Sequence, residues 1–433
     1  MINIIIAWRR LRKDKEYIFS NVLGLSVALA VAILSFVYLS TQLNYESNYS
    51  NSERIFRINS DLKIGDQTTH SAQTSDVLGP LFTAQIPEIE YHTRLFVPDQ
   101  TFKIRKGHKF LKESAAAFSD TSLFSVFDIP VLKKNAAKLL LDPNSVIISK
   151  SAAEKYFPDG HALGQTLEID DLSFGLRKSG MYEVAAVYDD FPVNTHLNFD
   201  FIFSATNLEY RWGENFAGFN FHTYILLEKG ADYRFVNEQI EAITRTTIFP
   251  ILSQQLGVSY SWNQFNEVGN SLSFSLFPIA DIHLHSDRVG EIGQNGSRQT
   301  IAILIVLSFF VLLMSCVNYV NLSTTQWMSR AREIGVRKVL GSSRKSLILQ
   351  FLSESLLIVS TSAVIAVFIA FICLPFFNEV LSSSITENNI FRWSTLAFLV
   401  LIAATVVWPV PHTRHLIYQN STFYRLGILR RQP

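Results

Sequence analysis

An apolar run from Thr300 to Trp327 contains no acidic or basic residue, and a short basic segment, Met328 to Ser346, follows it at once. A helix needs roughly 20 apolar residues to cross a bilayer, so this run is long enough to do so. Arginine and lysine concentrate in loops on the cytoplasmic side of a membrane. The junction therefore predicts a membrane helix whose C-terminal end lies in the cytoplasm.

Further apolar segments of membrane-like length lie at 17–41, 347–377 and 394–408. The first follows the basic sequence WRRLRKDK, which places the N-terminus in the cytoplasm. It is too long for the apolar region of a signal peptide, and no small-residue cleavage site follows it. The last segment is short for a span of roughly 20 residues. Four crossings would place both termini inside the cell and residues 42–297 outside.

Composition agrees with a membrane protein that carries a sizeable soluble part. Hydrophobic residues make up 48% of the 433 positions and charged residues only 17%, with 34 phenylalanines. A net charge of +1 argues against a nucleic-acid partner, because no basic surface dominates the chain. The only cysteines, Cys316 and Cys373, lie inside apolar runs, so the soluble part has no disulfide framework. We expect both to pack between helices or to face lipid.

The segment from 42 to 297 predicts a mixed α+β domain inserted between the first two membrane helices. Apolar residues alternate in LNFDFIFS and SLSFSL, as in half-buried strands, and recur at helical spacing in DVLGPLFTAQI and ADYRFVNEQIEAI. The strand positions are Leu197, Phe199, Phe201, Phe203, Leu272, Phe274 and Leu276, and the helix positions are Val77, Leu78, Leu81, Phe82, Val236, Ile240 and Ile243.

Catalytic motifs are absent from the sequence. It has no Gly-x-Ser-x-Gly, no His-Glu-x-x-His and no Walker-type phosphate loop, so we expect no enzymatic activity and no ATP bound by this chain itself. The best metal candidate is Asp281-Ile-His283-Leu-His285, whose alternate residues would share one face of a strand. A surface or packing role fits these residues better than zinc, because no fourth ligand is evident.

Glu354 is the only charged residue in the segment 347–377. A carboxylate inside a membrane usually has a functional reason. Because Glu354 lies close to the cytoplasmic end of this segment, a position at the membrane interface explains it equally well.

The basic segment predicts a short helix from Arg330 to Leu340. Glu333 and Arg337 are spaced to pair on one turn, and apolar residues broaden one side. Gly341 can take the left-handed position that ends a helix. The basic charges of this segment are enough to orient the membrane helices. The apolar side of the helix is not needed for orientation, and it favours a second role in docking a partner.

These residues resemble a known family. The sequence VNYVNLSTTQWMSRAREIGVRKVLGSSRKSLILQFLSES is similar to the cytoplasmic signature of MacB/FtsX-type ABC transporter permeases. The N-terminal AWRRLRKDKEYIFSNVLGLSVALA resembles the start of that family, and NSVIISKSAAEKYFPDGHALGQTLEI, FPVNTHLNFDFIFS and PIADIHLHS resemble its MacB-like periplasmic core domain.

The resemblance implies a multi-pass protein of the cell inner membrane in which a separate cytoplasmic ATPase binds and hydrolyses ATP. The chain would dock on that ATPase, pair with itself or another permease, meet a periplasmic adaptor and membrane lipid, and transmit motion to the periplasmic domain for efflux or extraction of a substrate. The implied coupling-helix contacts are Arg332, Glu333, Ile334, Gly335, Arg337, Lys338, Val339 and Gly341. The alternative reading is a membrane-anchored sensor or regulator, such as an FtsX-like activator of cell-wall hydrolases.

We therefore expect an α-helical integral membrane protein with about four transmembrane helices and a large α+β extracytoplasmic domain. The end of the chain, VVWPVPHTRHLIYQNSTFYRLGILRRQP, departs from the pattern of the family, and we expect a truncated half of a longer permease in preference to divergence. The expected segments are 1–16 cytoplasmic, 17–41 first span, 42–297 periplasmic core domain, 298–327 second span, 328–346 coupling helix, 347–377 third span, 378–393 periplasmic loop, 394–408 fourth span and 409–433 cytoplasmic tail.

Overall fold

The computed structural model describes residues 15–99, 101–131, 140–170, 180–208, 213, 215–257, 260–329, 336, 344–381, 383 and 385–407. The chain divides into two compact units. Met1–Leu43 and Ser297–Pro433 form one, which we call the helical unit, and Asn44–Gly296 form the other, which we call the sheet unit.

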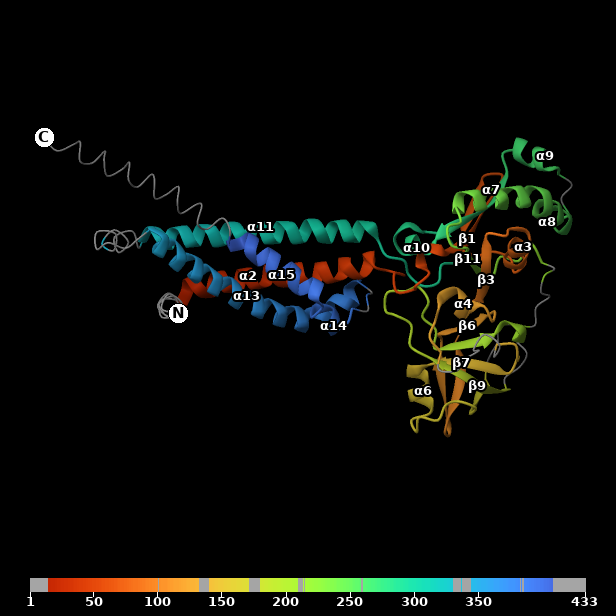
Figure 1. Ribbon diagram of the computed structural model, residues 1–433, viewed down its shortest axis with the longest axis horizontal. Helices are drawn as coiled ribbons and strands as arrows, with labels where there is room; N and C mark the ends of the chain where they lie inside the picture. The colour runs from red at the N-terminus through yellow and green to blue at the C-terminus, as the bar shows by residue number, and fades with distance from the viewer. Residues whose placement is uncertain are drawn as a thin grey trace. The chain divides into compact units, whose positions relative to one another are not determined.

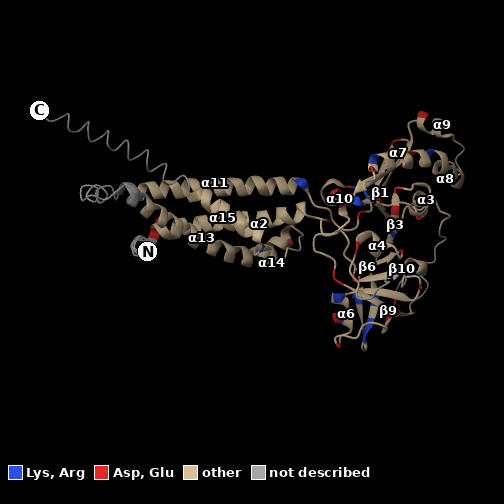
Figure 2. Ribbon diagram, in the orientation of Figure 1, with Lys and Arg blue, Asp and Glu red and all other residues tan. Residues whose placement is uncertain are grey.

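The helical unit contains three helices that are long and apolar enough to cross a membrane. These are α2 (Lys15–Leu43), α11 (Arg298–Ser329) and α13 (Arg344–Leu381). Lys, Arg, Asp and Glu are nearly absent along them (Figure 2). Helix α2 packs against both of the others, so much more of its apolar window is buried than of the window of α11.

The fourth apolar helix, α15 (Trp393–Val407), is shorter, and α14 (Glu387–Ile390) precedes it. Its 15 residues extend about 22 Å at 1.5 Å per residue, less than a hydrocarbon core of roughly 30 Å. It packs against α13 and α2, and Phe398 stacks on Phe36 of α2 with ring centroids 4.1 Å apart. A fourth crossing therefore stays a prediction.

Two side-chain hydrogen bonds join α2 to α11. The Tyr17 hydroxyl lies 2.9 Å from Oγ of Ser323, and Oγ of Ser308 donates to Oγ of Ser35 over 2.7 Å. The residues closer to the start of α2 pair with those closer to the end of α11, so the two helices are antiparallel and in fixed register. Polar contacts of this kind hold helices together in an apolar solvent.

The sheet unit contains one mixed sheet of twelve strands among the described residues (Figure 1). Its order is β12-β1-β11-β3-β6-β10-β7-β9-β8-β4-β5, with β2 paired to β1. The pairs β6–β10 and β7–β9 are parallel, and the others are antiparallel. The strands are β1 (Ile55–Ile64), β2 (Gln67–Ser71), β3 (Ile89–Phe96), β4 (Phe102–Lys106), β5 (Lys109–Glu113), β6 (Ala116–Ser119), β7 (Ser145–Ser149), β8 (Thr166–Asp170), β9 (Gly180–Tyr188), β10 (Phe201–Ser204), β11 (His222–Leu227) and β12 (Ser271–Pro278).

Short helices accompany this sheet: α3 (Leu78–Gln85), α4 (Leu123–Phe127), α6 (Lys150–Tyr156), α7 (Tyr233–Ile243), α8 (Phe249–Gln255), α9 (Trp262–Glu267) and α10 (Ile279–His285). The expected helices in DVLGPLFTAQI and ADYRFVNEQIEAI are present as α3 and α7. Leu78 and Phe82 of α3 and Val236, Ile240 and Ile243 of α7 are buried, as their spacing predicts.

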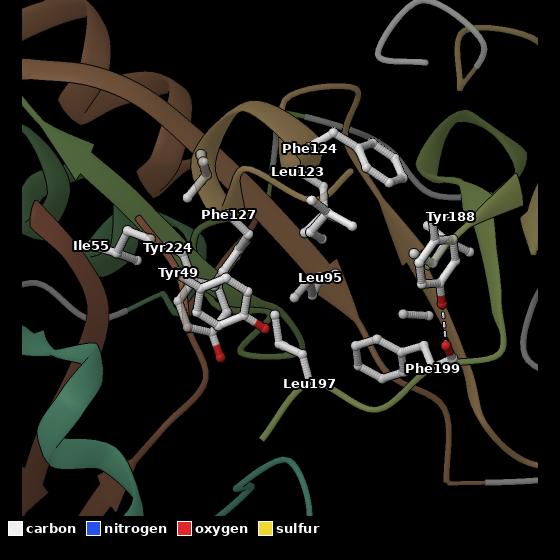
Figure 3. Close-up of a cluster of buried hydrophobic side chains, with 14 of the residues drawn as sticks. Tyr49, Ile55, Leu95, Leu123, Phe124, Phe127, Tyr188, Leu197, Phe199 and Tyr224 are labelled. Carbon is white, nitrogen blue, oxygen red and sulfur yellow. Dashed lines mark hydrogen bonds between the residues drawn. The ribbon is translucent and has the colours of Figure 1, made fainter. Parts of the chain in front are cut away.

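Apolar cores cover both faces of the sheet. Leu226 of β11 belongs to one core with residues of α4 and α10, whereas its neighbours Ile225 and Leu227 belong to another with residues of α3, α7 and α8. On β7, Ile147 lies in the first core and Val146 and Ile148 in a third. Figure 3 shows part of the first core, with Leu95 and Leu197 among aromatic rings. Central strands are therefore buried on both faces and carry continuous apolar runs.

This burial corrects one expected strand. The prediction placed Leu197, Phe199, Phe201 and Phe203 on one face, but the strand begins only at Phe201 and its four residues are all buried. Leu197 and Phe199 belong to the first core, while Phe201 and Phe203 belong to the third, on the opposite face. In contrast, β12 lies at the end of the sheet and alternates buried apolar residues with exposed or half-buried serines, as SLSFSL predicts.

Candidate functional site

Two chain segments connect the sheet unit to the long helices. The first connector, residues 44–51, directly follows α2, and the second connector, residues 286–296, directly precedes α11. Both belong to the sheet unit. Buried ionic and hydrogen-bonding groups fix each of them to strands of the sheet.

Glu46 holds the first connector. It adopts a left-handed backbone conformation with φ 61°, and its side chain has no exposed surface. Oε1 accepts a 2.6 Å hydrogen bond from the backbone N–H of His196 and lies 2.7 Å from Nδ1 of the same residue. Oε2 accepts from Oγ1 of Thr195 over 2.7 Å. A buried carboxylate is tolerated when its oxygens are satisfied in this way.

His196 also contacts a strand of the sheet. Its Nε2 lies 2.6 Å from the hydroxyl of Tyr224 on β11. Burial raises the pKa of Tyr224 far above its ordinary value, so its hydroxyl stays protonated. Nδ1 on the other side of the ring faces Glu46. These two contacts connect Tyr224 on a central strand, through His196, to Glu46 in the first connector.

Tyrosine side chains reinforce the first connector on either side of Glu46. The hydroxyl of Tyr45 donates to the backbone carbonyl of Thr195 over 2.9 Å, and its ring stacks on His283 of α10 with centroids 3.5 Å apart. The hydroxyl of Tyr49 lies 2.9 Å from Oγ1 of Thr195, and its ring packs edge-on against Phe127, which contacts Tyr224 in the same way (Figure 3). Burial lowers the pKa of His283 to about 4, so this histidine is neutral at neutral pH.

Arg57 of β1 holds the second connector. Its side chain is fully buried and binds both carboxylate oxygens of Glu291, at 2.5 and 2.9 Å. It also donates to Oγ of Ser286 and to Oδ1 of Asn59, each at 2.9 Å. Burial opposes ionisation of Glu291, but the hydrogen bonds and charge of Arg57 outweigh it and lower the pKa of Glu291. A two-pronged arginine–carboxylate pair is strong and strict in its geometry.

A second ion pair and backbone contacts extend this attachment. Arg288 pairs with Asp61 of β1 over 2.6 Å, and the carbonyl of Val289 accepts a hydrogen bond from the N–H of Ala72 over 2.9 Å. Arg57 is the register partner of Tyr224 on β11, so the attachments of the two connectors share one strand pair, β1 and β11. We call the set Glu46, Thr195, His196, Tyr224, Arg57, Ser286 and Glu291 the connector lock.

The connector lock lies almost entirely in the interior of the sheet unit. Its charged groups are paired and almost fully shielded from solvent, so no substrate can reach them as they stand. Separating one partner of a buried ion pair typically costs about 3–5 kcal/mol. Displacement of either connector would therefore carry the strands along rather than pull free of them.

The predicted coupling residues Arg332, Glu333, Ile334, Gly335, Arg337, Lys338, Val339 and Gly341 lie outside the described residues. Their role stays a prediction. Glu354 lies in the first turns of α13, half-buried, and accepts a hydrogen bond from Gln350 over 3.2 Å.

The structure corrects the expected strand at Asp281, His283 and His285. These residues lie on helix α10, where Asp281 and His285 face each other across one turn at 3.5 Å while His283 points into the core against Tyr45. No group of three or more His, Cys, Asp or Glu residues that could hold a metal occurs in the part of the chain that the structure describes.

Sequence reasoning missed the connector lock. One signal was available in the sequence. Glu46, in LNYES, comes just after an apolar span, and Arg57, in FRINSD, lies within a strand that lines a core. Their partners, His196 and Glu291, are distant in sequence, and nothing local indicates the pairing.

Two family models match the chain. The MacB-like periplasmic core domain matches residues 19–243, and the FtsX-like permease C-terminal domain matches residues 305–410. No protein with a curated description matches. The first of these models alone covers more than half of the 433 residues.

Solved structures match about half of the chain. A domain of a permease protein from Porphyromonas gingivalis has 19% identity and a TM-score of 0.42, covering 53% of this chain and 91% of its own. The periplasmic region of MacB from Actinobacillus actinomycetemcomitans has 11% identity and a TM-score of 0.34, with the same coverages of 53% and 91%. The extracellular domain of the transporter YknZ from Gram-positive bacteria has 14% identity and a TM-score of 0.31, covering 51% and 99%.

Proposed function

Because this chain belongs to the MacB/FtsX-type ABC transporter permeases, we propose that it is the membrane subunit that converts ATP hydrolysis by a separate ATPase into movement of its sheet unit. Permeases of this family are transporters and generally work with a cytoplasmic ATPase. The chain is a membrane protein with a domain of the MacB periplasmic type. In the proposal it lies in the inner membrane, forms a dimer with itself or another permease, and exports a substrate or extracts it from the membrane.

The connector lock is the observation that carries this proposal. A mechanical transmitter needs stiff joints where its helices meet the moving domain. Both connectors are held by buried polar contacts, the first by Glu46 with His196 and the second by the ion pair of Arg57 with Glu291. A displacement of α2 or α11 along its axis would then be delivered to strands β1 and β11.

The helical unit supports the same reading. The Tyr17–Ser323 and Ser35–Ser308 contacts fix the register of α2 against α11 at two separate levels. In our proposal the two helices move as one rod, driven from their cytoplasmic ends. The force would enter through the segment containing Glu333 and Arg337, which follows α11 directly in the sequence.

Purification from native membranes tests the partner. We expect an affinity-tagged full chain to recover an ABC ATPase identified by mass spectrometry, and Glu333→Arg with Arg337→Glu to lose it. A matched control reverses charges outside this segment, with Glu387→Arg and Arg392→Glu near α14. Undiminished recovery by the Glu333/Arg337 variant would remove the docking assignment, and recovery of a sensor kinase instead of an ATPase would favour the sensor reading.

A further inference from the structure

The hairpin of β4 and β5 carries a concentration of positive charge within the sheet unit. The sequence from Lys103 to Lys112 reads KIRKGHKFLK and contains no acidic residue, although the whole chain has a net charge of only +1. Figure 2 shows Lys and Arg gathered at this end of the sheet, near α6 and β9. Lys106, Lys109 and Lys112 are exposed.

Like charges face each other across the hairpin. Lys106 lies directly opposite Lys109, and Lys112 lies opposite Lys103. Lys103 is also the register partner of Asp170 on β8, but among the described residues no ion pair neutralises Lys106, Lys109 or Lys112. Directly opposed like charges destabilise a strand pair. The hairpin therefore keeps a destabilising arrangement that an anionic ligand would relieve.

An aromatic residue lies within this charged surface. Phe110 is 39% exposed, and the guanidinium of Arg105 stands over its ring, 4.7 Å from the centroid. Arg105 is held there by Glu168 of β8 at 2.6 Å. Phe110, Arg105 and Lys112 lie on one face of the hairpin, because residues of a strand alternate between faces. They form a small apolar platform with a cationic rim.

Among the described residues, strand β5 pairs only with β4 and forms an open end of the sheet. The opposite end is closed: α7 packs along β12, and Asn237 accepts a hydrogen bond from the N–H of Leu276 over 2.8 Å. Among the described residues, no hydrogen bond from outside the hairpin reaches the main chain of Lys109 to Lys112. Unpaired strand edges accept an extended peptide as an added strand.

We propose that the edge of β5 binds an extended acidic segment of another extracytoplasmic protein, which adds as a strand beside Lys109–Lys112. Lysines on an edge repel a second copy of the same edge, which excludes self-pairing and leaves the edge open to a strand of opposite charge. The tip of the hairpin, Gly107 and His108, offers no apolar side chain that could enter a lipid surface, so a peptide fits better than a membrane. This surface is separate from the connector lock and from the coupling segment.

A binding experiment on the full chain in zwitterionic nanodiscs tests the proposal. The probe is a fluorescein-labelled peptide of alternating glutamate and valine, followed by anisotropy at low ionic strength, where exposed charges are screened least. We expect Lys106→Ser, Lys109→Ser and Lys112→Ser together to weaken binding about tenfold. The matched control, Lys63→Ser, Lys150→Ser and Lys229→Ser, removes the same charge from exposed positions elsewhere and should bind as the native chain does.

Two further measurements separate the alternatives. The same peptide with methylated backbone nitrogens keeps its charge but cannot pair as a strand, and we expect it to bind at least tenfold more weakly. Equal binding by the methylated peptide, or displacement of the peptide by soluble dihexanoylphosphatidylglycerol at lower concentration than by unlabelled peptide, would overturn the proposal. The triple hairpin variant should have a melting temperature no lower than that of the native chain, because it removes repulsion between lysines. If this folded variant binds the peptide as tightly as the native chain does, the proposed site is refuted.

Discussion

The Glu46 carboxylate lies 2.7 Å from Nδ1 of His196, with the two side chains 0% and 3% exposed. Glu46 comes just after α2 ends at Leu43, and His196 contacts Tyr224 in the middle of the sheet. The pair therefore links the end of a membrane-length helix to the core of the sheet unit by way of buried polar groups. Its contribution to stability and to coupling can be measured separately.

Glu46→Gln should destabilise the sheet unit by about 3 kcal/mol, because it removes one partner of a buried, charge-assisted network. For a unit of this size the loss corresponds to a fall of roughly 6–12 °C in melting temperature. Thermal unfolding of the full chain in nanodiscs, followed by tryptophan fluorescence, checks this. Exposed Glu53→Gln is the matched control and should change the melting temperature by less than about 2 °C.

The Arg57–Glu291 pair should behave as a coupled unit in a double-mutant cycle. Glu291→Gln leaves the buried guanidinium without its countercharge and should cost about 3–5 kcal/mol, as should Arg57→Met. The double variant should cost less than the sum of the two by about 2 kcal/mol or more, because no unpaired charge remains. Additive losses in urea unfolding would show that the pair carries no special interaction.

Acidification should weaken the sheet unit through His283. Its folded pKa is about 4, against an ordinary value of 6.5, so the unfolded chain binds the proton first as pH falls. The contribution of the neutral ring is fully present above pH ~6.5 and is lost as pH falls from there toward ~4, by about 2 kcal/mol at pH 5.

His283→Phe keeps an aromatic ring against Tyr45 and cannot titrate. We expect it to flatten the dependence of the melting temperature on pH between roughly 7 and 5. Exposed His161→Phe should leave the slope as it is in the native chain. An unchanged slope in the His283 variant would show that other groups carry the acid sensitivity.

The register of α2 against α11 predicts a specific cross-link. Ser35→Cys and Ser308→Cys, with Cys316→Ser and Cys373→Ser to remove the native thiols, should join efficiently under mild oxidation because the two hydroxyl oxygens are 2.7 Å apart. Protease cleavage between the helices followed by non-reducing electrophoresis detects the link. The pair Ser35→Cys with Met314→Cys uses a residue 71% exposed on α11, and it should not join.

Periodicity located the long helices and the amphipathic ones because these features are local. The helices α2, α11 and α13 follow directly from uninterrupted apolar runs, and α7 follows from the spacing of Val236, Ile240 and Ile243. The strand SLSFSL was readable because β12 lies at the sheet end and has one solvated face.

Features that depend on distant contacts were not readable. The alternation in LNFDFIFS predicted a half-buried strand. Cores on both faces of the sheet bury every residue of β10, so alternating apolar residues do not mark a buried and an exposed face there. PIADIHLHS looked like a strand and is a helix, because tertiary packing of Ile279, Ile282 and His283 overrides a pattern of only a few residues. The connector lock joins Glu46 to His196 and Arg57 to Glu291, pairs that no short-range rule proposes.

The distance between the two units during ATP turnover tests whether motion of the helical unit reaches the sheet unit. Spin labels at Lys229→Cys in the sheet unit and Asn388→Cys in the helical unit, both exposed, on a background without native cysteines, report it by double electron–electron resonance. With the ATPase bound, we expect different distance distributions in the nucleotide-free and ATP-trapped states, and a smaller difference in Glu46→Gln. Identical distributions in both states, with the ATPase bound and active, would contradict this expectation.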